Sequence, residues 1–180
     1  GIYGDLPQEM RSRQLLTDRF VCVVRKGHPQ VGKRFTLDQF VRLLHIQVAP
    51  RGKPGGYVDD VLRERGLTRT VARAVPYFVT ALQLVAQTDY VLTISERIAK
   101  RYADSFGLQI MEVPISLRPY ALSLLWHPRV DSDPGHRFLR DAFLRAAREV
   151  AGQRHEDART RLDVTDPTSG QTRKRPRKRL

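Results

Sequence analysis

The feature that most constrains the fold of this chain is the alternation of short apolar runs with segments of helical periodicity. The apolar runs are rich in β-branched and aromatic residues, which favours strands. They predict strands at 19–25, 45–49, 70–75, 90–94, 108–113 and 120–126. The intervening and following segments predict helices at 36–44, 57–66, 76–87, 95–107 and 134–150. This alternation is typical of an α/β fold, so we expect a mostly parallel sheet flanked by helices.

Capping residues mark the ends of several predicted helices. Thr36 and Ser95 precede helical segments and suit the N-cap, because their hydroxyl oxygens can accept a backbone N–H. Pro76 suits the first helical position, where a missing N–H costs nothing. Gly66 and Gly107 follow helical segments and suit the left-handed position beyond a helix end.

Length and composition are those of a globular domain without a membrane segment. The 180 residues suffice for one core, and the 41% apolar and 28% charged residues are an ordinary balance. No apolar run approaches the roughly 20 residues that a membrane helix needs. The first residues, "GIYGDLPQEM", show neither the basic nor the apolar region of a signal peptide. Together with a single cysteine, Cys22, this predicts a reducing, cytoplasmic location.

The stretch "WHPRVDSDPGHRFLR" gathers His127, Asp131, Asp133 and His136 and so resembles a metal or catalytic site. A plainer interpretation is a strand that passes into a helix. Asp133 then is the N-cap, Pro134 the first helical residue and His136 the third. Asp131 adds negative charge near the positive end of the helix dipole. We therefore expect structural roles for these four side chains.

Sequence motifs of common enzyme classes are absent. The chain has no GxSxG, GxxxxGK[ST], HExxH or GxGxxG. Its histidines form no spacing typical of a metal site, and they are His28, His45, His127, His136 and His155. Cys22 lies in a predicted buried strand, which disfavours a role as nucleophile. We expect neither enzymatic activity nor a cofactor.

Positive charge is concentrated at the C-terminus. The formal net charge is +13, and the last eight residues, "RKRPRKRL", contain no acidic residue. Helical periodicity stops near residue 152, so 151–180 is predicted to be a disordered basic tail. Clustered cations can bind nucleic-acid phosphates without sequence specificity. The candidates for such contacts are Arg173, Lys174, Arg175, Arg177, Lys178 and Arg179. The alternative is a solvated tail without a partner.

Ligands of α/β sheets bind at the carboxyl ends of strands, close to helix N-termini. Three strand-to-helix junctions meet this condition: "VAPRGKPGGY", "VPYFV" and "TISER". The loop "RGKPGG" could offer Arg51 and backbone N–H groups to a small carboxylate, although an ordinary loop explains it as well.

Four ordered segments resemble the effector-binding domain of LysR-type transcriptional regulators. They are "LPQEMRSRQLLTDRFVCVVRKGHP", "TLDQFVRLLHIQVAPRG", "RTVARAVPYFVTALQLVAQTDYVLTISERIAKRY" and "LLWHPRVDSDPGHRFLRD". The last is similar to a run of the branch that responds to aromatic and flavonoid inducers. The resemblance covers roughly residues 1–148.

The resemblance implies two α/β lobes of the type II periplasmic-binding-protein-like fold, with a small effector between them. Residues 1–19 would end the first lobe and cross over, and 20–119 would form the second lobe. Residues 120–150 would return to the first lobe. The family's helix-turn-helix, linker helix and first half of the first lobe have no counterpart here, so we expect a fragment or a degenerate gene. Promoter DNA would be bound only through that missing part, and the full-length family forms homo-oligomers.

The resemblance also implies the second-lobe wall of an effector site. Its residues would be Pro50, Arg51, Gly52, Tyr77, Phe78, Thr93 and Ser95. Tyr77 and Phe78 could stack on a planar ring, and helix N-termini near Phe78 and Ser95 suit an anion. Core packing of Phe78 and capping by Thr93 and Ser95 are the alternatives. Tyr77 and Ser95 depart from relatives that have His and Pro, which bears on the inducer class.

Three functions follow as hypotheses. The first is an effector-sensing domain that binds a small aromatic or carboxylate inducer. The second is a lobe of a solute-binding protein with the same fold, and the third is a nonspecific nucleic-acid binder that acts through the basic tail. In none of them do we expect a membrane partner.

Overall fold

The computed structural model describes residues 9–50 and 55–163, with side chains up to residue 151. Within these residues, no helix is both long and apolar enough to cross a membrane. The contacts divide the chain into two units. Residues 17–121 form one unit, which we call the sheet unit. Residues 1–16 and 122–180 form the other, which we call the helix unit.

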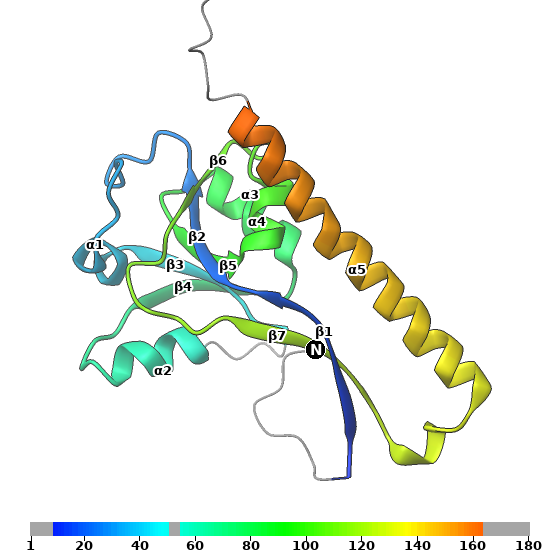
Figure 1. The fold of residues 1–180 in the computed structure, drawn as a ribbon. Helices are drawn as coiled ribbons and strands as arrows, with labels where there is room; N and C mark the ends of the chain where they lie inside the picture. Colours follow the sequence, from blue (N-terminus) through cyan, green and yellow to red (C-terminus); the bar gives the residue numbers. More distant parts are fainter. Residues whose placement is uncertain (1–8, 51–54, 164–180) are drawn as a thin grey trace, which may run out of the picture. The chain divides into compact units, whose positions relative to one another are not determined.

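The sheet unit is built on five strands in the order β4-β3-β5-β2-β6 (Figure 1). Their bounds are β2 Phe20–Arg25, β3 Leu44–Val48, β4 Thr70–Val75, β5 Val91–Ser95 and β6 Leu108–Met111. β3 is parallel to both β4 and β5. β2 is antiparallel to both β5 and β6. The sheet is therefore mixed, and the expectation of a mostly parallel sheet holds only for its β4-β3-β5 half.

Four helices cover the two faces of this sheet. They are α1 Leu37–Arg42, α2 Tyr57–Arg63, α3 Phe78–Ala86 and α4 Glu96–Tyr102. Because side chains alternate along a strand, Val21 and Val23 pack with buried residues of α3 and α4. Cys22 and Val24 face the opposite way, into the cluster that contains residues of α1 and α2. The unit is thus a three-layer sandwich with an apolar core on each face of the sheet.

The predicted caps are mostly confirmed. The Thr36 hydroxyl accepts from the backbone N–H of Gln39, whose own side chain completes a capping box. The Ser95 hydroxyl accepts from the N–H of Ile98 at the start of α4. Gly66 and Gly107 have positive φ angles of 67° and 63°, the conformation for which glycine is suited.

The start of α3 and the end of α4 differ from the predictions. α3 begins at Phe78, with Tyr77 as its N-cap, so Pro76 precedes the helix instead of opening it. α4 ends at Tyr102 and is followed by turns up to Gly107.

β7, Tyr120–Trp126, pairs with β1, Arg11–Asp18, and most of each strand lies in the helix unit. Both strands run across the boundary between the units. After a short 3-10 turn at Pro128–Val130, the long helix α5 spans Pro134–Asp163. The prediction that helical structure stops near residue 152 is therefore wrong, because 151–163 continues the helix. Residues 164–180, including the basic tail, lie outside the described residues.

Candidate functional site

The carboxyl ends of three parallel strands meet at one edge of the sheet unit, as predicted from the strand-to-helix junctions. β3, β4 and β5 each lead into a helix whose N-terminus lies just beyond the strand. The N-caps are Gly56 for α2, Tyr77 for α3 and Ser95 for α4. Exposed N–H groups at such ends carry partial positive charge, so this carboxyl edge is the part of the unit best suited to an anionic or polar ligand.

At the start of α3 the edge offers aromatic side chains beside an uncapped helix end. Tyr77 is 70% exposed and Phe78 is 45% exposed, so the alternative that Phe78 packs into the core is wrong. No side chain caps α3, and its first turn contains no acidic residue. Within the described residues, no side chain therefore caps the first N–H groups of this helix, and its N-cap Tyr77 and first residue Phe78 are aromatic.

The start of α4 is different, because the protein itself supplies a carboxylate there. The Ser95 hydroxyl donates to Oδ2 of Asp18 at 2.5 Å. The Tyr120 hydroxyl donates to the same oxygen at 3.3 Å, and the Arg19 N–H donates to Oδ1 at 2.8 Å. Asp18 is 5% exposed. We call Asp18, Ser95 and Tyr120 the Asp18 bridge. Sequence reasoning predicted Ser95 alone, because nothing local marks Asp18 or Tyr120 as its partners.

A charged cluster lies beside the Asp18 bridge. The Arg19 guanidinium donates to Glu96 at 2.8 Å and to Glu112 at 2.6 Å, and Lys100 pairs with Glu96 at 2.8 Å. The hydrogen bond from Arg19 is the largest cause that lowers the pKa of buried Glu96 to about 2. The cluster therefore stays ionised near neutral pH and holds the first turn of α4 against the start of β2.

Three aromatic rings gather near the same edge. The ring centroids of Phe20 and Tyr120 are 4.8 Å apart, and those of Phe20 and Tyr57 are 6.1 Å apart. The Tyr57 hydroxyl accepts from the backbone N–H of Arg118 at 2.8 Å, which fixes its ring. Burial is the largest cause that raises the pKa of Tyr120, so its hydroxyl remains a donor. These rings were not predicted as site residues.

The other predicted site residues are Pro50, Arg51 and Gly52 in the loop after β3, and Thr93 in β5. Pro50 is exposed just after β3, whereas Arg51 and Gly52 lie outside the described residues. The Gln47 side chain holds the far end of this loop, since it exchanges hydrogen bonds of 2.8 and 2.9 Å with the backbone of Gly55. Thr93 is half-buried.

Thr93 and Cys22 lie in the interior of the sheet. The Thr93 hydroxyl is 3.6 Å from the Cys22 sulfur. Burial raises the pKa of the Cys22 thiol to about 12, so the thiolate is disfavoured. Thr93 accordingly belongs to the strand packing and not to the exposed carboxyl edge.

The histidine-rich stretch after β7 has the structural role predicted for it. The Asp133 carboxylate accepts from the His136 N–H at 2.7 Å, which confirms the N-cap. His127 Nδ1 accepts from the Arg129 N–H at 3.1 Å. Among the described residues, no group of three or more His, Cys, Asp or Glu could hold a metal ion. The side chain of His155 is outside that description.

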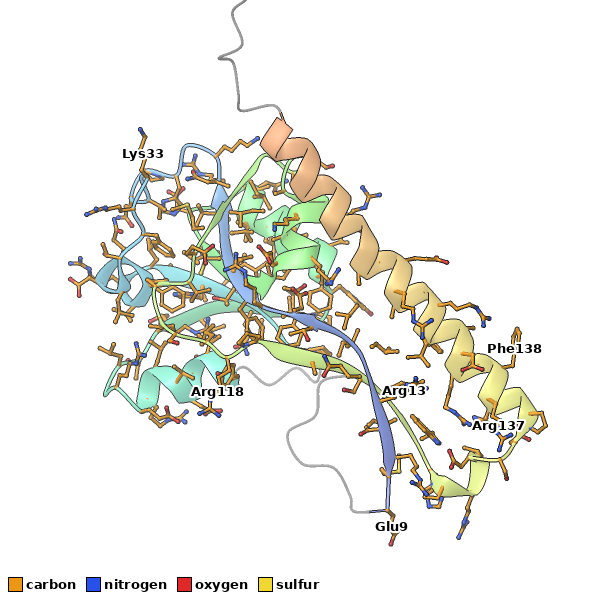
Figure 2. The ribbon with its side chains drawn as sticks, viewed as in Figure 1. Glu9, Arg13, Lys33, Arg118, Arg137 and Phe138 are labelled. Atoms are coloured by element: carbon orange, nitrogen blue, oxygen red, sulfur yellow. The ribbon has the colours of Figure 1, made fainter. Side chains whose placement is uncertain are left out.

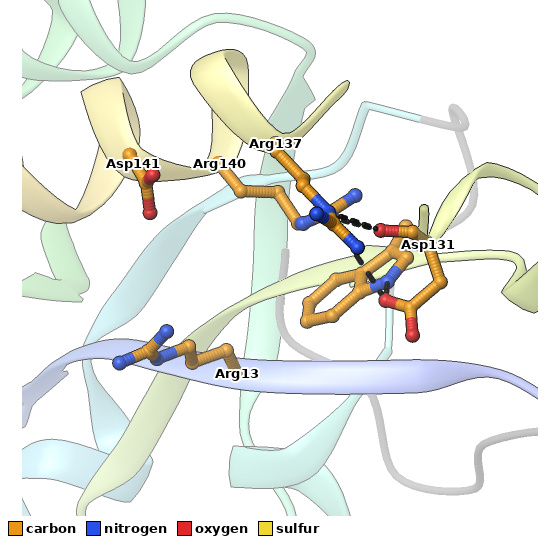
Figure 3. A pocket seen from close by; sticks show the side chains of 6 residues that line it. Arg13, Asp131, Arg137, Arg140 and Asp141 are labelled. Carbon is orange, nitrogen blue, oxygen red and sulfur yellow. Dashed lines mark hydrogen bonds and ion pairs between the residues drawn. The ribbon is translucent and has the colours of Figure 1, made fainter. Parts of the chain in front are cut away.

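A polar hollow of about 340 Å³ lies within the helix unit (Figure 3). The Trp126 indole N–H donates to Asp131 at 2.8 Å, and the Arg140 guanidinium lies 4.8 Å from the centre of the Trp126 ring. Arg137 and Arg140 also donate to the Asp131 carbonyl, at 3.2 and 2.7 Å. Asp131 thus joins the end of β7 to the first turns of α5, which explains its place in the stretch.

The sheet unit has a mixed sheet between two helical layers, with helix N-termini converging on one strand edge. This is the architecture of a lobe of the type II periplasmic-binding-protein-like fold, and the similar solved structures are LysR regulatory domains with that fold. The family model described as "LysR substrate binding domain" matches residues 2–148. The chain therefore belongs to the family of LysR substrate-binding domains.

Individual relatives agree with this assignment. The chain is 36% identical over 148 residues to the HTH-type transcriptional regulator SyrM of Rhizobium meliloti, covering 82% of this chain and 45% of SyrM. It is 33% identical over 144 residues to the HTH-type transcriptional activator NagR of Ralstonia sp., covering 80% of this chain and 48% of NagR. The chain thus spans about half the length of these curated relatives.

A solved structure shares the fold. It is that of the probable transcriptional regulator PA0477 from Pseudomonas aeruginosa, with a TM-score of 0.72 and 29% identity. The match covers 78% of this chain and 46% of that one.

Proposed function

We propose that the carboxyl edge of the sheet unit binds a small aromatic carboxylate as the effector of a transcription regulator. The observation that carries this proposal is the start of α3, where uncapped N–H groups stand beside exposed Tyr77 and Phe78. The N–H groups suit a carboxylate, and the rings suit a planar apolar body. At the start of α4 the ligand would have to compete with Asp18, which accepts from the Ser95 hydroxyl at 2.5 Å.

The rest of the proposal concerns the whole regulator. In this proposal the chain binds an effector and does not catalyse a reaction. It acts in the cytoplasm without a cofactor. The whole regulator is a homo-oligomer. Specific promoter binding belongs to the helix-turn-helix that the relatives' names mention. The names of the relatives, which are transcription regulators, support the sensing role.

Thermal unfolding with benzoate as the probe tests the site. Binding to the folded state alone raises the melting temperature in proportion to the logarithm of ligand concentration. We expect Tyr77→Ala to weaken benzoate binding about two- to tenfold, since stacked aromatic contacts contribute roughly 0.5–1.5 kcal/mol. Tyr102→Ala is the matched control, because Tyr102 is 37% exposed but lies at the far end of α4. If benzoate and hydroxylated benzoates all leave the melting temperature unchanged, the proposed effector class is wrong.

The basic tail supports a second proposal, namely nonspecific nucleic-acid binding by residues 173–179. Six cations without an intervening acid can each displace a counterion from a phosphate. We expect duplex DNA binding to weaken steeply as salt rises, and deletion of 173–180 to flatten that dependence. An unchanged salt slope after the deletion would exclude a role for the tail.

A further inference from the structure

Asp18 lies at the point where the chain passes from one unit to the other. Along the chain, the boundary between the units falls between residues 16 and 17 and again between 121 and 122. We call these two boundaries the crossings. Asp18 follows the first of these crossings closely, and Tyr120 precedes the second. Both residues belong to the sheet unit, so their contact is internal to it. A carboxylate at this place touches both segments through which the units are connected.

The Asp18 carboxylate accepts three hydrogen bonds, each from a different part of the sheet unit. Ser95 at the end of β5 donates at 2.5 Å, and Tyr120 at the start of β7 donates at 3.3 Å. The backbone N–H of Arg19, at the start of β2, donates at 2.8 Å. The carbonyl of Arg19 in turn accepts from the N–H of Glu96 at 2.9 Å. The first turn of α4 and both crossings are therefore joined through one buried side chain.

A buried carboxylate depends on its donors, because an unsatisfied charge in the protein interior is costly. Charge-assisted hydrogen bonds of this kind are stronger than neutral ones. Withdrawal of one donor leaves the others to hold the same charge, so the carboxylate must reorient or admit water. The position of the Ser95 hydroxyl is thereby coupled to how firmly the two crossing segments are held.

We propose that Asp18 is a positioning residue that couples the effector-facing Ser95 to both crossings between the units. The inference rests on the proposed function insofar as Ser95 faces the ligand. A ligand group that takes the Ser95 hydroxyl must compete with Asp18, and the released carboxylate then loosens its bonds to Arg19 and Tyr120. Occupancy of the carboxyl edge is in this way transmitted to the segments that connect the lobes.

Residue-resolved hydrogen exchange of the full 180-residue chain, without ligand, tests the coupling. Ser95→Ala should speed exchange about fivefold at the Arg19 amide and in segment 120–122, the change expected for loss of one hydrogen bond. Ser95→Thr keeps the hydroxyl and should restore the slow exchange. Thr36→Ala is the matched control, because it removes the equivalent helix cap from α1 without touching Asp18. Fast exchange at the crossings in Thr36→Ala as well would overturn the proposal.

Two further variants probe the other arms of the bridge. Tyr120→Phe removes only the phenolic hydroxyl and should speed exchange of the Ile98 amide, which bonds the Ser95 hydroxyl at 3.3 Å. Asp18→Asn keeps the shape of the side chain but not its charge and should affect all three sites. Exchange that rises only next to each substitution would show that the three residues are not coupled, even if one of the variants fails to fold.

The same hydrogen-exchange measurement in the presence of benzoate distinguishes failure of this inference from failure of the proposed function. Benzoate should speed exchange at Arg19 and 120–122 in the wild-type chain but not in Asp18→Asn. If the ligand-free coupling is present and benzoate does not bind, the effector class is wrong while the role of Asp18 stands. If benzoate binds to the carboxyl edge and the crossings do not respond, the role of Asp18 is rejected while the effector site stands.

Discussion

At the scale of single residues, burial determines which ionisable groups can change their charge. His45 is fully buried, and its Nε2–H donates to the Phe40 carbonyl at 2.7 Å. Its Nδ1 lies 3.4 Å from the Arg69 guanidinium, which Asp59 holds through two hydrogen bonds. These partners suit a neutral imidazole. Burial is the largest cause that lowers the pKa of His45 to about 4.

This pKa predicts a loss of stability in mild acid. Between about pH 6.5 and pH 4 the unfolded chain binds a proton at His45 and the folded chain does not, so the stabilisation is present above this window and is lost as the pH falls through it. Between about pH 7 and pH 5, urea unfolding should show a loss of about 2 kcal/mol from this residue. His45→Asn, which keeps a donor for Phe40, should lose most of that dependence. An equal pH dependence in variant and wild type would contradict the prediction.

At the scale of elements, a side-chain cap marks where α5 starts, and helix propensity carries it beyond the part with an apolar face. α5 begins at a cap that the sequence shows plainly, since Asp133 accepts from the His136 N–H. Its C-terminal end was misjudged because residues 151–163 lack large apolar side chains, although most of them are compatible with a helix. Apolar periodicity reports the face that packs and not the length of the helix.

The cap of α5 gives a prediction about stability. Asp133→Ala should lower the free energy of unfolding by about 1 kcal/mol, because the His136 N–H loses its acceptor. Ser132→Ala, at the exposed neighbouring position, is the control and should have little effect. Urea unfolding monitored by circular dichroism measures both. A loss of benzoate binding in Asp133→Ala without loss of stability would reopen the catalytic or ligand-binding interpretation of this stretch.

At the scale of the whole molecule, the helix unit leaves apolar side chains in solvent. The Phe138 side chain points away from α5 (Figure 2) and is 70% exposed. Leu139, Phe143 and Val150 are between 44% and 50% exposed. They lie along one side of a helix of which Ala147 is a buried residue. Exposed apolar side chains that are contiguous promote association. The chain spans about half the length of its curated relatives, so this surface is a candidate contact for the remainder of a longer regulator.

We therefore expect the isolated chain to self-associate through α5. The double variant Phe138→Ser, Phe143→Ser should raise the monomer fraction in light scattering coupled to size-exclusion chromatography, because less apolar area is removed from water on association. Arg145→Ser lies on the same helix at an exposed position and should leave the association unchanged. A wild-type chain that is monomeric and monodisperse at high concentration would contradict this prediction.

Site residues could be predicted from the sequence where their interactions are local, and could not where the interacting residues are far apart along the chain. Ser95, Tyr77 and Phe78 were identified because a strand followed by a helix start is a local pattern. Asp18 and Tyr120 were missed because their hydrogen bonds span 77 and 102 positions of the chain. No spacing rule connects residues so far apart. The family resemblance implied which edge of the sheet would bind a ligand. It did not indicate that Asp18 and Tyr120 would form hydrogen bonds at this edge.

By itself, the sequence determined the order and type of most elements, their caps and the family, because propensity, periodicity and capping act over a few residues. Strand β1, Arg11–Asp18, was not among the predicted strands. Only the tertiary structure decided the direction of β2, which makes the sheet mixed, and the meeting of Asp18 with Ser95 and Tyr120. Strand direction and buried hydrogen bonds depend on which distant segments pack together. The packing free energy of the whole unit settles them, and no short stretch of the chain contains that information.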